Sequence, residues 1–282
     1  MERLLVTTQD LAKHLDDPAW VVFDTRHDLM DPAKGRRAYE AGHIPGAYFL
    51  SVDHDLSGGK TGTNGRHPLP SLEEFAATMN ERGVKPGTQV VAYDDLSGNF
   101  AVRLWWMLRW LGHDKVALLD GGLPLWTKEG RPVTKDVPAA RHGSFVPRPE
   151  LGASVDVHFV DRFRESPSIR LIDARAPDRY AGVQEPIDPV AGHVPGAVNR
   201  FWQKNLNPDG TFKEPEQLRA EFGELLGSRD PSQTVHMCGS GVTACHNLFA
   251  MELAGLAPGR LYPGSWSEWC ADPARAVAAD KK

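Results

Sequence analysis

A near-identical internal repeat is the feature that most restricts how this 282-residue chain can fold. The segment AGHIPGA at 41–47 returns as AGHVPGA at 191–197. Each copy follows an apolar run that closes with an Asp-x-Arg motif, VVFDTR at 21–26 and RLIDAR at 170–175. Self-similarity of this kind indicates that one structural unit occurs twice.

Further matching segments follow each repeat in the same order. The apolar run at 88–94 (TQVVAYD) matches 234–238 (TVHMC), and LLDGGLPLW at 118–126 matches LYPGSWSEW at 261–269. Helical patterns occupy corresponding places in the two copies. Ser71 and Glu74 form a capping-box pattern before one of these helices, at 71–83, and the helix predicted at 214–227 carries a proline in its first turn.

The alternation of apolar strands with helices predicts the fold class. Strands that read as continuous apolar runs are typical of parallel sheets covered by helices on both faces. We therefore expect an α/β protein of two tandem domains, each a mainly parallel sheet with helices on both faces. The predicted boundaries are 1–138 for the first domain, 139–152 for a linker rich in proline and glycine, and 153–282 for the second domain.

Composition excludes several classes of function. The formal net charge of -5 offers no basic surface for nucleic acid, and no apolar run is long enough to span a membrane. The N-terminal segment lacks the pattern of a signal peptide. There are three cysteines, Cys238, Cys245 and Cys270, all near the C-terminal end, which argues against a disulfide framework. We expect a reducing compartment, the cytoplasm.

Cys238 is the main candidate for chemistry. It ends a predicted strand and precedes the loop GSGVT and a helix. Backbone amides of a glycine-rich loop and the positive end of a helix both stabilise an anion, so we expect a lowered thiol pKa. Asp94 occupies the corresponding place in the first copy. The first domain is therefore predicted to be catalytically inactive, whereas Cys245 and Cys270 are predicted to be structural.

Two reactions suit a cysteine in such a loop. A phosphatase of the Cys-x5-Arg type needs an arginine six positions after the cysteine to clamp the phosphate, and this chain has Ala244 there. Sulfur transfer through a cysteine persulfide needs only the amide cradle, and the sequence favours it. A sulfur-carrier or regulatory module without enzymatic activity remains an alternative of another class.

The whole chain resembles the tandem-domain rhodanese-type sulfurtransferases, on the repeated AGH[IV]PGA, the LLDGG…W and PGSW…W segments and the CGSGVTAC loop. The loop is most similar to that of the 3-mercaptopyruvate sulfurtransferases. The resemblance implies transfer of a sulfane sulfur from 3-mercaptopyruvate through a Cys238 persulfide, with release of pyruvate. The acceptor would be a thiol, thioredoxin or cyanide, and neither a cofactor nor a metal is implied. The alternative is a thiosulfate:cyanide sulfurtransferase, which carries two basic residues where this loop has Gly239 and Ser240.

The resemblance also implies roles for residues outside the loop. Arg179 would bind the donor carboxylate, and Ile187 or Asp188 stands where mercaptopyruvate enzymes carry a second arginine. We expect Arg200 to substitute for it. An Asp–His–Ser relay would assist proton transfer, and the remaining loop residues would bind substrate. The relay would consist of Asp53 (with Asp55 as an alternative), His67 and Ser240, and the loop residues are Gly239, Gly241, Val242 and Thr243.

The repeated histidines His43 and His193 occur also in the copy without the cysteine. We therefore expect them to have a folding role, as hydrogen-bonding partners in a turn. Arg26 and Arg175 of the Asp-x-Arg motifs are expected to tie the end of a strand to the neighbouring loop.

Overall fold

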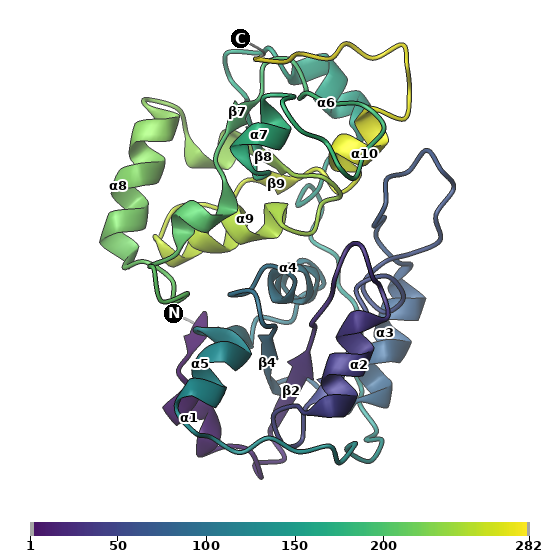
Figure 1. Cartoon of the computed structure of the whole chain (residues 1–282), viewed down its shortest axis with the longest axis vertical. Coiled ribbons are helices and arrows are strands. Elements are labelled where there is room, and N and C mark those ends of the chain that lie inside the picture. The colour runs from purple at the N-terminus through teal and green to yellow at the C-terminus, as the bar shows by residue number, and fades with distance from the viewer. Residues whose placement is uncertain (1–2, 281–282) are drawn as a thin grey trace. The chain divides into compact units, whose positions relative to one another are not determined.

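The structure is a computed structural model that describes residues 3–280, and its chain divides into two compact units. The N-terminal unit contains the residues up to Gly58, residues 69–150 and residues 208–212. The C-terminal unit contains residues 59–68, residues 151–207 and the chain from Lys213 onward. Figure 1 labels the helices and strands of both units. Among residues 3–280, no helix is both long and apolar enough to cross a lipid bilayer.

The N-terminal unit is built on a five-stranded sheet in which every neighbouring pair is parallel. The order across the sheet is β1-β5-β4-β2-β3. The strands are β1 (Leu5–Val6), β2 (Trp20–Asp24), β3 (Tyr48–Phe49), β4 (Gln89–Tyr93) and β5 (Val116–Leu119).

Helices α1 (Thr8–Ala12) and α5 (Gly122–Lys128) cover one face of this sheet. Leu11 of α1 and Trp126 of α5 are fully buried there against Val91 and its neighbours. Helix α4 (Ala101–Trp110) packs against β4 and β5. The other helices are α2 (Lys34–Ala41) and α3 (Leu72–Glu81).

The C-terminal unit repeats this plan with four strands, again all parallel. Its order is β7-β6-β8-β9, the same sequence of neighbours as β3-β2-β4-β5 in the first unit. Ser154 forms a single bridge with Leu261 at the edge where β1 would lie. The strands are β6 (Arg170–Asp173), β7 (Val198–Asn199), β8 (Thr234–Met237) and β9 (Arg260–Leu261). The predicted parallel α/β fold is confirmed.

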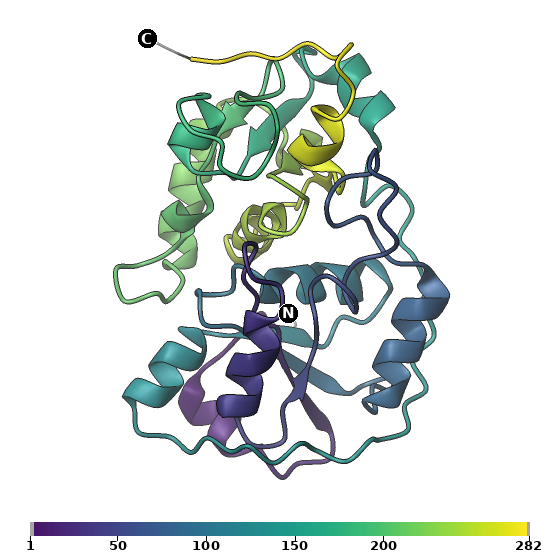
Figure 2. The ribbon, with the colours of Figure 1, turned by 45° about the vertical axis from the view of Figure 1, so that its right-hand side comes forward.

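Helices cover both faces of the C-terminal sheet (Figures 1 and 2). On one face, α6 (Val157–Phe163) and α10 (Ser265–Trp269) bury Trp266 and Trp269 against Leu171 and Val235. On the other face, α8 (Pro215–Leu226) and α9 (Ala244–Leu253) pack with Ile172. Three short helices complete the unit, namely α7 (Pro177–Tyr180), η1 (Trp202–Asn205) and η2 (Pro231–Gln233).

Local signals in the sequence explain where two of the helices begin. The Ser71 hydroxyl accepts a hydrogen bond from the Glu74 amide at 3.2 Å, and the Glu74 carboxylate accepts one from the Ser71 amide at 3.1 Å. This is the predicted capping box, and it satisfies two amides that the first turn of α3 leaves unpaired. Pro215 is the first residue of α8, where its missing N–H costs nothing.

The two Asp-x-Arg motifs make the same turn in both units. Arg26 pairs with Asp24 at 2.7 Å and donates to the Gly42 carbonyl at 2.8 Å, and Arg175 does the same with Asp173 and Gly192 at the same distances. The repeated histidines are equally matched. Nδ1 of each contacts the carbonyl of the tyrosine on which its ring stacks, in the pairs His43–Tyr39 and His193–Tyr180. Their predicted folding roles are confirmed.

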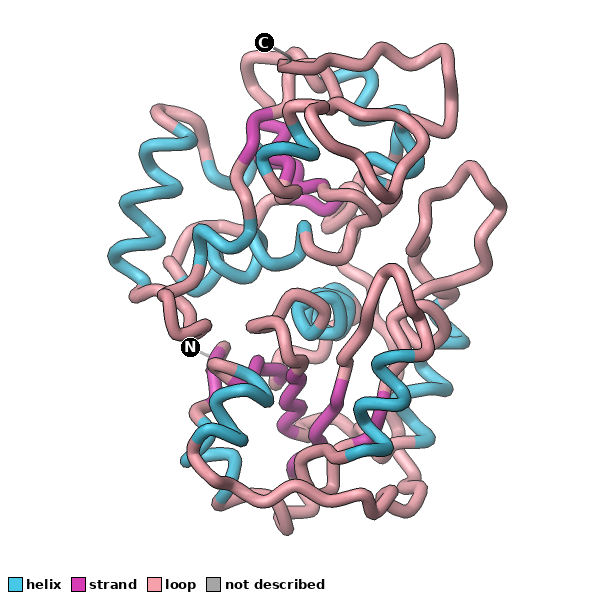
Figure 3. The backbone as a smooth tube through the Cα atoms, in the orientation of Figure 1, coloured by secondary structure: helices cyan, strands magenta, loops and turns pink. Residues whose placement is uncertain are grey.

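Each unit also contains a short segment from the other half of the sequence, which the repeat does not predict. Residues 59–68 belong to the C-terminal unit, where the Arg66 amide donates to the Ser267 hydroxyl at 3.0 Å. In the N-terminal unit, the Phe212 amide donates to the Asp120 carboxylate at 2.9 Å. Both segments are loops (pink in Figure 3). The proposed linker at 139–152 stays a prediction, with residues 139–150 lying in the N-terminal unit.

Candidate functional site

Cys238 lies between the end of β8 and the start of α9, and only 3 % of the residue is exposed. Helix α10 holds its backbone in place. The Cys238 amide donates to the Ser265 hydroxyl at 3.1 Å, and the Cys238 carbonyl accepts from the Trp266 amide at 3.1 Å. The next carbonyl, that of Gly239, accepts from the Ser267 amide at 2.9 Å. The first turn of α10 therefore orients the start of the loop.

The Ser265 backbone has the left-handed φ of 52°, which residues other than glycine rarely adopt. Its hydroxyl accepts from the Cys238 amide and donates to the Tyr262 carbonyl at 2.8 Å. Strained residues of this kind persist where the surroundings hold them, and they gather at functional sites. The Ser265 hydroxyl thus links the backbone of Cys238 to that of Tyr262, which directly follows β9.

The loop after Cys238 needs glycine at one of its two glycine positions for a steric reason. Gly241 has a φ of 77°, and a methyl group there would lie 2.2 Å from the Pro263 carbonyl oxygen. The Cys245 thiol donates to the Gly241 carbonyl at 3.4 Å, so this cysteine supports the loop from inside α9. Val242 is buried, and Thr243 is the N-cap residue of α9.

Ser240 and His67 form the contact that the sequence predicts. A hydrogen bond of 2.7 Å joins the Ser240 hydroxyl to Nδ1 of His67. The residues are 4 % and 3 % exposed, so water competes little for this bond. His67 reaches the loop because segment 59–68 is part of the C-terminal unit. A hydroxyl paired with an imidazole can pass a proton at neutral pH.

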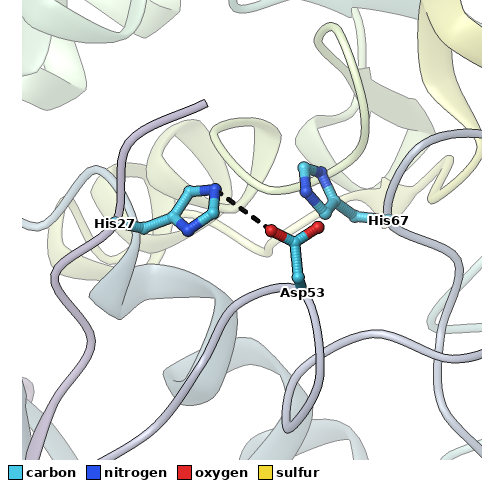
Figure 4. A group of neighbouring side chains, drawn as sticks. All are labelled: His27, Asp53 and His67. Carbon is cyan, nitrogen blue, oxygen red and sulfur yellow. Dashed lines mark ion pairs between the residues drawn. The ribbon is translucent and has the colours of Figure 1, made fainter. Parts of the chain in front are cut away.

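The proposed third member of this relay, Asp53, belongs to the N-terminal unit. Its carboxylate lies 3.8 Å from Nε2 of His27 (Figure 4). The alternative, Asp55, accepts hydrogen bonds from the Ser51 amide at 2.7 Å and from Arg82 at 3.3 Å. Asp55 is therefore held by its own loop and by Arg82 at the end of α3. The participation of Asp53 in a relay stays a prediction.

Two arginines lie beside Gly239, the residue that follows Cys238. A methyl group on Gly239 would lie 2.7 Å from Nη2 of Arg66 and 3.5 Å from both terminal nitrogens of Arg179. Arg179 was expected near the loop from the resemblance. Arg66 was not, although it directly precedes His67 in the sequence and its position was available as a signal. Bulky residues cannot replace Gly239 unless Arg66 moves.

Both arginines form ion pairs with carboxylates. Arg179 donates to Glu185 at 2.7 Å and to Asp188 at 3.1 Å, and Arg66 also pairs with Asp188. Glu185 lies within 3.3 Å of Arg175 as well. Burial lowers the pKa of the Arg66 guanidinium, and the like charge of Arg179 acts in the same direction.

Arg200, the expected substitute for a second arginine, lies elsewhere in the C-terminal unit. Its guanidinium donates to Glu221 at 2.7 Å and to Asn205 at 3.2 Å, and it stacks 4.7 Å above the Phe222 ring. The structure gives it these partners rather than the loop. Cys270, expected to be structural, is buried, and burial raises the pKa of its thiol.

The candidate site therefore combines the thiol of Cys238, a hydroxyl–imidazole pair and two guanidiniums. The guanidiniums can hold a small anion beside Cys238, and the hydroxyl–imidazole pair can move one proton. This combination suits attack on a small anionic molecule from which a leaving group departs as a base.

Comparison with known proteins gives consistent matches. The family model described as the Rhodanese-like domain matches twice, at residues 7–129 and 157–272. A Pseudomonas aeruginosa protein named "Probable 3-mercaptopyruvate sulfurtransferase" is 48% identical over 276 residues, 97% of each chain. The thiosulfate sulfurtransferase of Mus musculus is 35% identical, covering 95% of this chain and 92% of its own. The solved structure of the 3-mercaptopyruvate sulfurtransferase from Leishmania major matches with a TM-score of 0.83 and 29% identity, over 95% of this chain and 74% of that one.

Proposed function

The chain belongs to the rhodanese family, and from that premise we propose that it transfers a sulfur atom from 3-mercaptopyruvate to an acceptor through a persulfide on Cys238. The pair of guanidiniums beside Gly239 supports the binding of a small anion there, and the choice of 3-mercaptopyruvate rests on the relative that is 48% identical and on the uncharged residues Gly239 and Ser240. Arg66 and Arg179 together suit one carboxylate next to the nucleophile. Arg66 supplies from another segment the cation that the loop itself lacks.

In the first step, the Cys238 thiolate attacks the sulfur of the donor. The new S–S bond forms as the C–S bond breaks, and its electron pair goes to carbon as the enolate of pyruvate. The proton of the donor thiol ends on that carbon, and the persulfide remains ionised. Atoms and charge therefore balance without a further reactant. We assign this proton transfer to Ser240 and His67, because their hydrogen bond of 2.7 Å joins two groups that can exchange a proton.

In the second step, a thiol, thioredoxin or cyanide takes the outer sulfur of the persulfide. This follows the logic of thiol–disulfide exchange, with Cys238 as the leaving thiolate. The three cysteines are free, which is consistent with a reducing compartment, and we place the protein in the cytoplasm.

Mass spectrometry after incubation with 3-mercaptopyruvate tests the intermediate. We expect one added sulfur atom on the peptide that contains Cys238, and none in Cys238→Ser. Cys270→Ser is the matched control and should still gain the sulfur. Absence of the added atom in the unmodified protein would reject the proposal. A persulfide that forms but is never passed to any small acceptor would instead indicate a carrier.

Steady-state kinetics test the donor. With cyanide as acceptor, kcat/KM should be higher for 3-mercaptopyruvate than for thiosulfate. Arg66→Ala and Arg179→Ala should each raise KM for 3-mercaptopyruvate by about tenfold or more, because each removes a charged hydrogen bond. Arg200→Lys should leave KM unchanged. A clear preference for thiosulfate would favour the other activity found among the relatives.

A further inference from the structure

Asp188 occupies a position that an incoming anion would be expected to take. One of its carboxylate oxygens pairs with Arg66, and the other accepts from Arg179 at 3.1 Å. Its side chain is only 2 % exposed. A carboxylate bridging two guanidiniums beside the nucleophile has the chemistry of the donor's own carboxylate.

The loop between α7 and β7 is built to deliver this carboxylate. Glu185 accepts hydrogen bonds from the amides of Ile187 and Asp188, both at 3.1 Å, which folds the loop back on itself. The Trp266 indole donates to the Val190 carbonyl at 2.9 Å and fixes the far side of the loop. Asp188 is thus held by its own loop as well as by the arginines.

The charges around the loop are balanced. Three guanidiniums, those of Arg66, Arg175 and Arg179, face three carboxylates, those of Asp173, Glu185 and Asp188. Asp173 is fully buried against Arg175, and Glu185 holds the loop, so both are fixed. Glu185 also pairs with Arg179, at 2.7 Å, so Asp188 is the carboxylate that contacts both arginines beside Gly239.

We propose that Asp188 is a specificity-determining residue that competes with anions for Arg66 and Arg179 and thereby sets the charge of the donor that the site accepts. This inference rests on the proposed function in one respect, the binding of a donor anion by those two arginines. Each donor must share or displace this internal carboxylate. The penalty is larger for a dianion such as thiosulfate than for a monoanion, because repulsion scales with the product of the charges.

Alkylation of Cys238 tests the proposal without any sulfur donor. Iodoacetate carries a charge and iodoacetamide does not, so the ratio of their rates at Cys238 reports attraction of anions to the site. We expect Asp188→Asn to raise that ratio by about tenfold. Asp188→Ser should do the same, whereas Asp188→Glu keeps the charge and should not. Asp178→Asn is the matched control, because Asp178 is an exposed carboxylate on α7 next to Arg179.

The proposal would be overturned if the ratio of the iodoacetate rate to the iodoacetamide rate stayed unchanged in both Asp188→Asn and Asp188→Ser. It would also be overturned if this ratio rose equally in Asp178→Asn. Kinetics give the second readout. In Asp188→Asn, kcat/KM for thiosulfate should rise relative to that for 3-mercaptopyruvate, and a fall would count against the inference. If the alkylation ratio rises but 3-mercaptopyruvate is not a donor, the proposed function fails and the role of Asp188 stands.

Discussion

The two loops that follow the central strands, after β4 in one unit and after β8 in the other, begin with different side chains. In the N-terminal unit, the Asp94 carboxylate accepts four backbone hydrogen bonds. They come from the amides of Leu96, Gly98, Phe100 and Ala101, at 2.7 to 2.9 Å. In the C-terminal unit, the same place holds Cys238, and the loop GSGVT brings no carboxylate.

The surrounding backbone is otherwise alike. The Asp94 carbonyl accepts from the Leu123 amide at 3.0 Å, as the Cys238 carbonyl accepts from the Trp266 amide. The comparison teaches that this strand–loop–helix junction is suited to an anion. One unit satisfies it with the buried carboxylate of Asp94, and the other holds the sulfur of Cys238, which under the proposed function takes up and releases a sulfur atom.

Asp94→Asn is the substitution with the largest expected effect. Each carboxylate oxygen accepts two amides, and the NH₂ group of asparagine can accept none, so two buried donors lose their partners. We expect the free energy of unfolding to fall by about 3 kcal/mol at neutral pH. Urea unfolding would measure it, with the exposed neighbour in Asp95→Asn as control. Burial raises the pKa of Asp94 despite its four hydrogen bonds, so removing the charge offsets part of the loss.

A small effect of Asp94→Asn, comparable with that of Asp95→Asn, would break the comparison. It would mean that the loop of the N-terminal unit keeps its shape without an anion. Cys238→Ser should change the free energy of unfolding by less than about 1 kcal/mol. The substitution removes the sulfur atom but no set of hydrogen bonds like the four that Asp94 accepts.

His236 of β8 gives a second contrast, because Ala92 occupies the matching position in β4. Burial lowers the pKa of His236 to about 3. The unfolded chain therefore binds a proton below about pH 6.5 while the folded chain does not, and the stability that His236 contributes above that pH is lost as the pH falls toward 3. Between pH 7 and pH 5 the loss is about 2 kcal/mol.

His236→Ala should remove that part of the pH dependence, measured as the change in unfolding free energy between the two pH values. The absolute stability of the variant does not enter this difference. An identical loss in both proteins would show that His236 is protonated in the folded state.

Ser265→Gly has the smallest expected effect and restores the residue that the N-terminal unit has at this position, Gly122, whose φ is 56°. Glycine relieves the backbone strain but removes the hydroxyl that accepts from the Cys238 amide. We expect kcat/KM to fall about tenfold with no loss of stability, a cost of about 1.4 kcal/mol in the transition state. Ser265→Ala keeps the strain and should lose both activity and stability. Full activity in Ser265→Gly would show that the hydroxyl does not position the nucleophile.

Sequence reasoning could predict features that depend on local pattern. The repeat implied two parallel sheets, Ser71 and Glu74 implied the start of α3, and both were confirmed. The contact of Ser240 with His67 was also expected, and it forms at 2.7 Å. The repeat and the capping box are patterns in the sequence itself, whereas the contact of Ser240 with His67 was implied only by the resemblance to the rhodanese-type sulfurtransferases.

What could not be predicted depends on long-range packing. Arg66 could have been expected only through His67, its neighbour in the sequence, because no local pattern shows that residues 59–68 join the unit that carries Cys238. Arg200 was chosen for its charge, yet its guanidinium pairs with Glu221 on α8, a partner that only the folded chain reveals. Asp188 stands where an arginine was expected, and no pattern in the sequence indicates that its carboxylate reaches the guanidiniums.

The crossing of residues 59–68 into the C-terminal unit has an evolutionary consequence. A descendant protein without the first half would keep the thiol of Cys238 but would lose the imidazole of His67 and the guanidinium of Arg66. Gene duplication is ordinarily reversible, since either copy can be deleted. Under the proposed function, the half that carries Asp94 could not be deleted here, because its residues 59–68 supply two groups at the Cys238 loop.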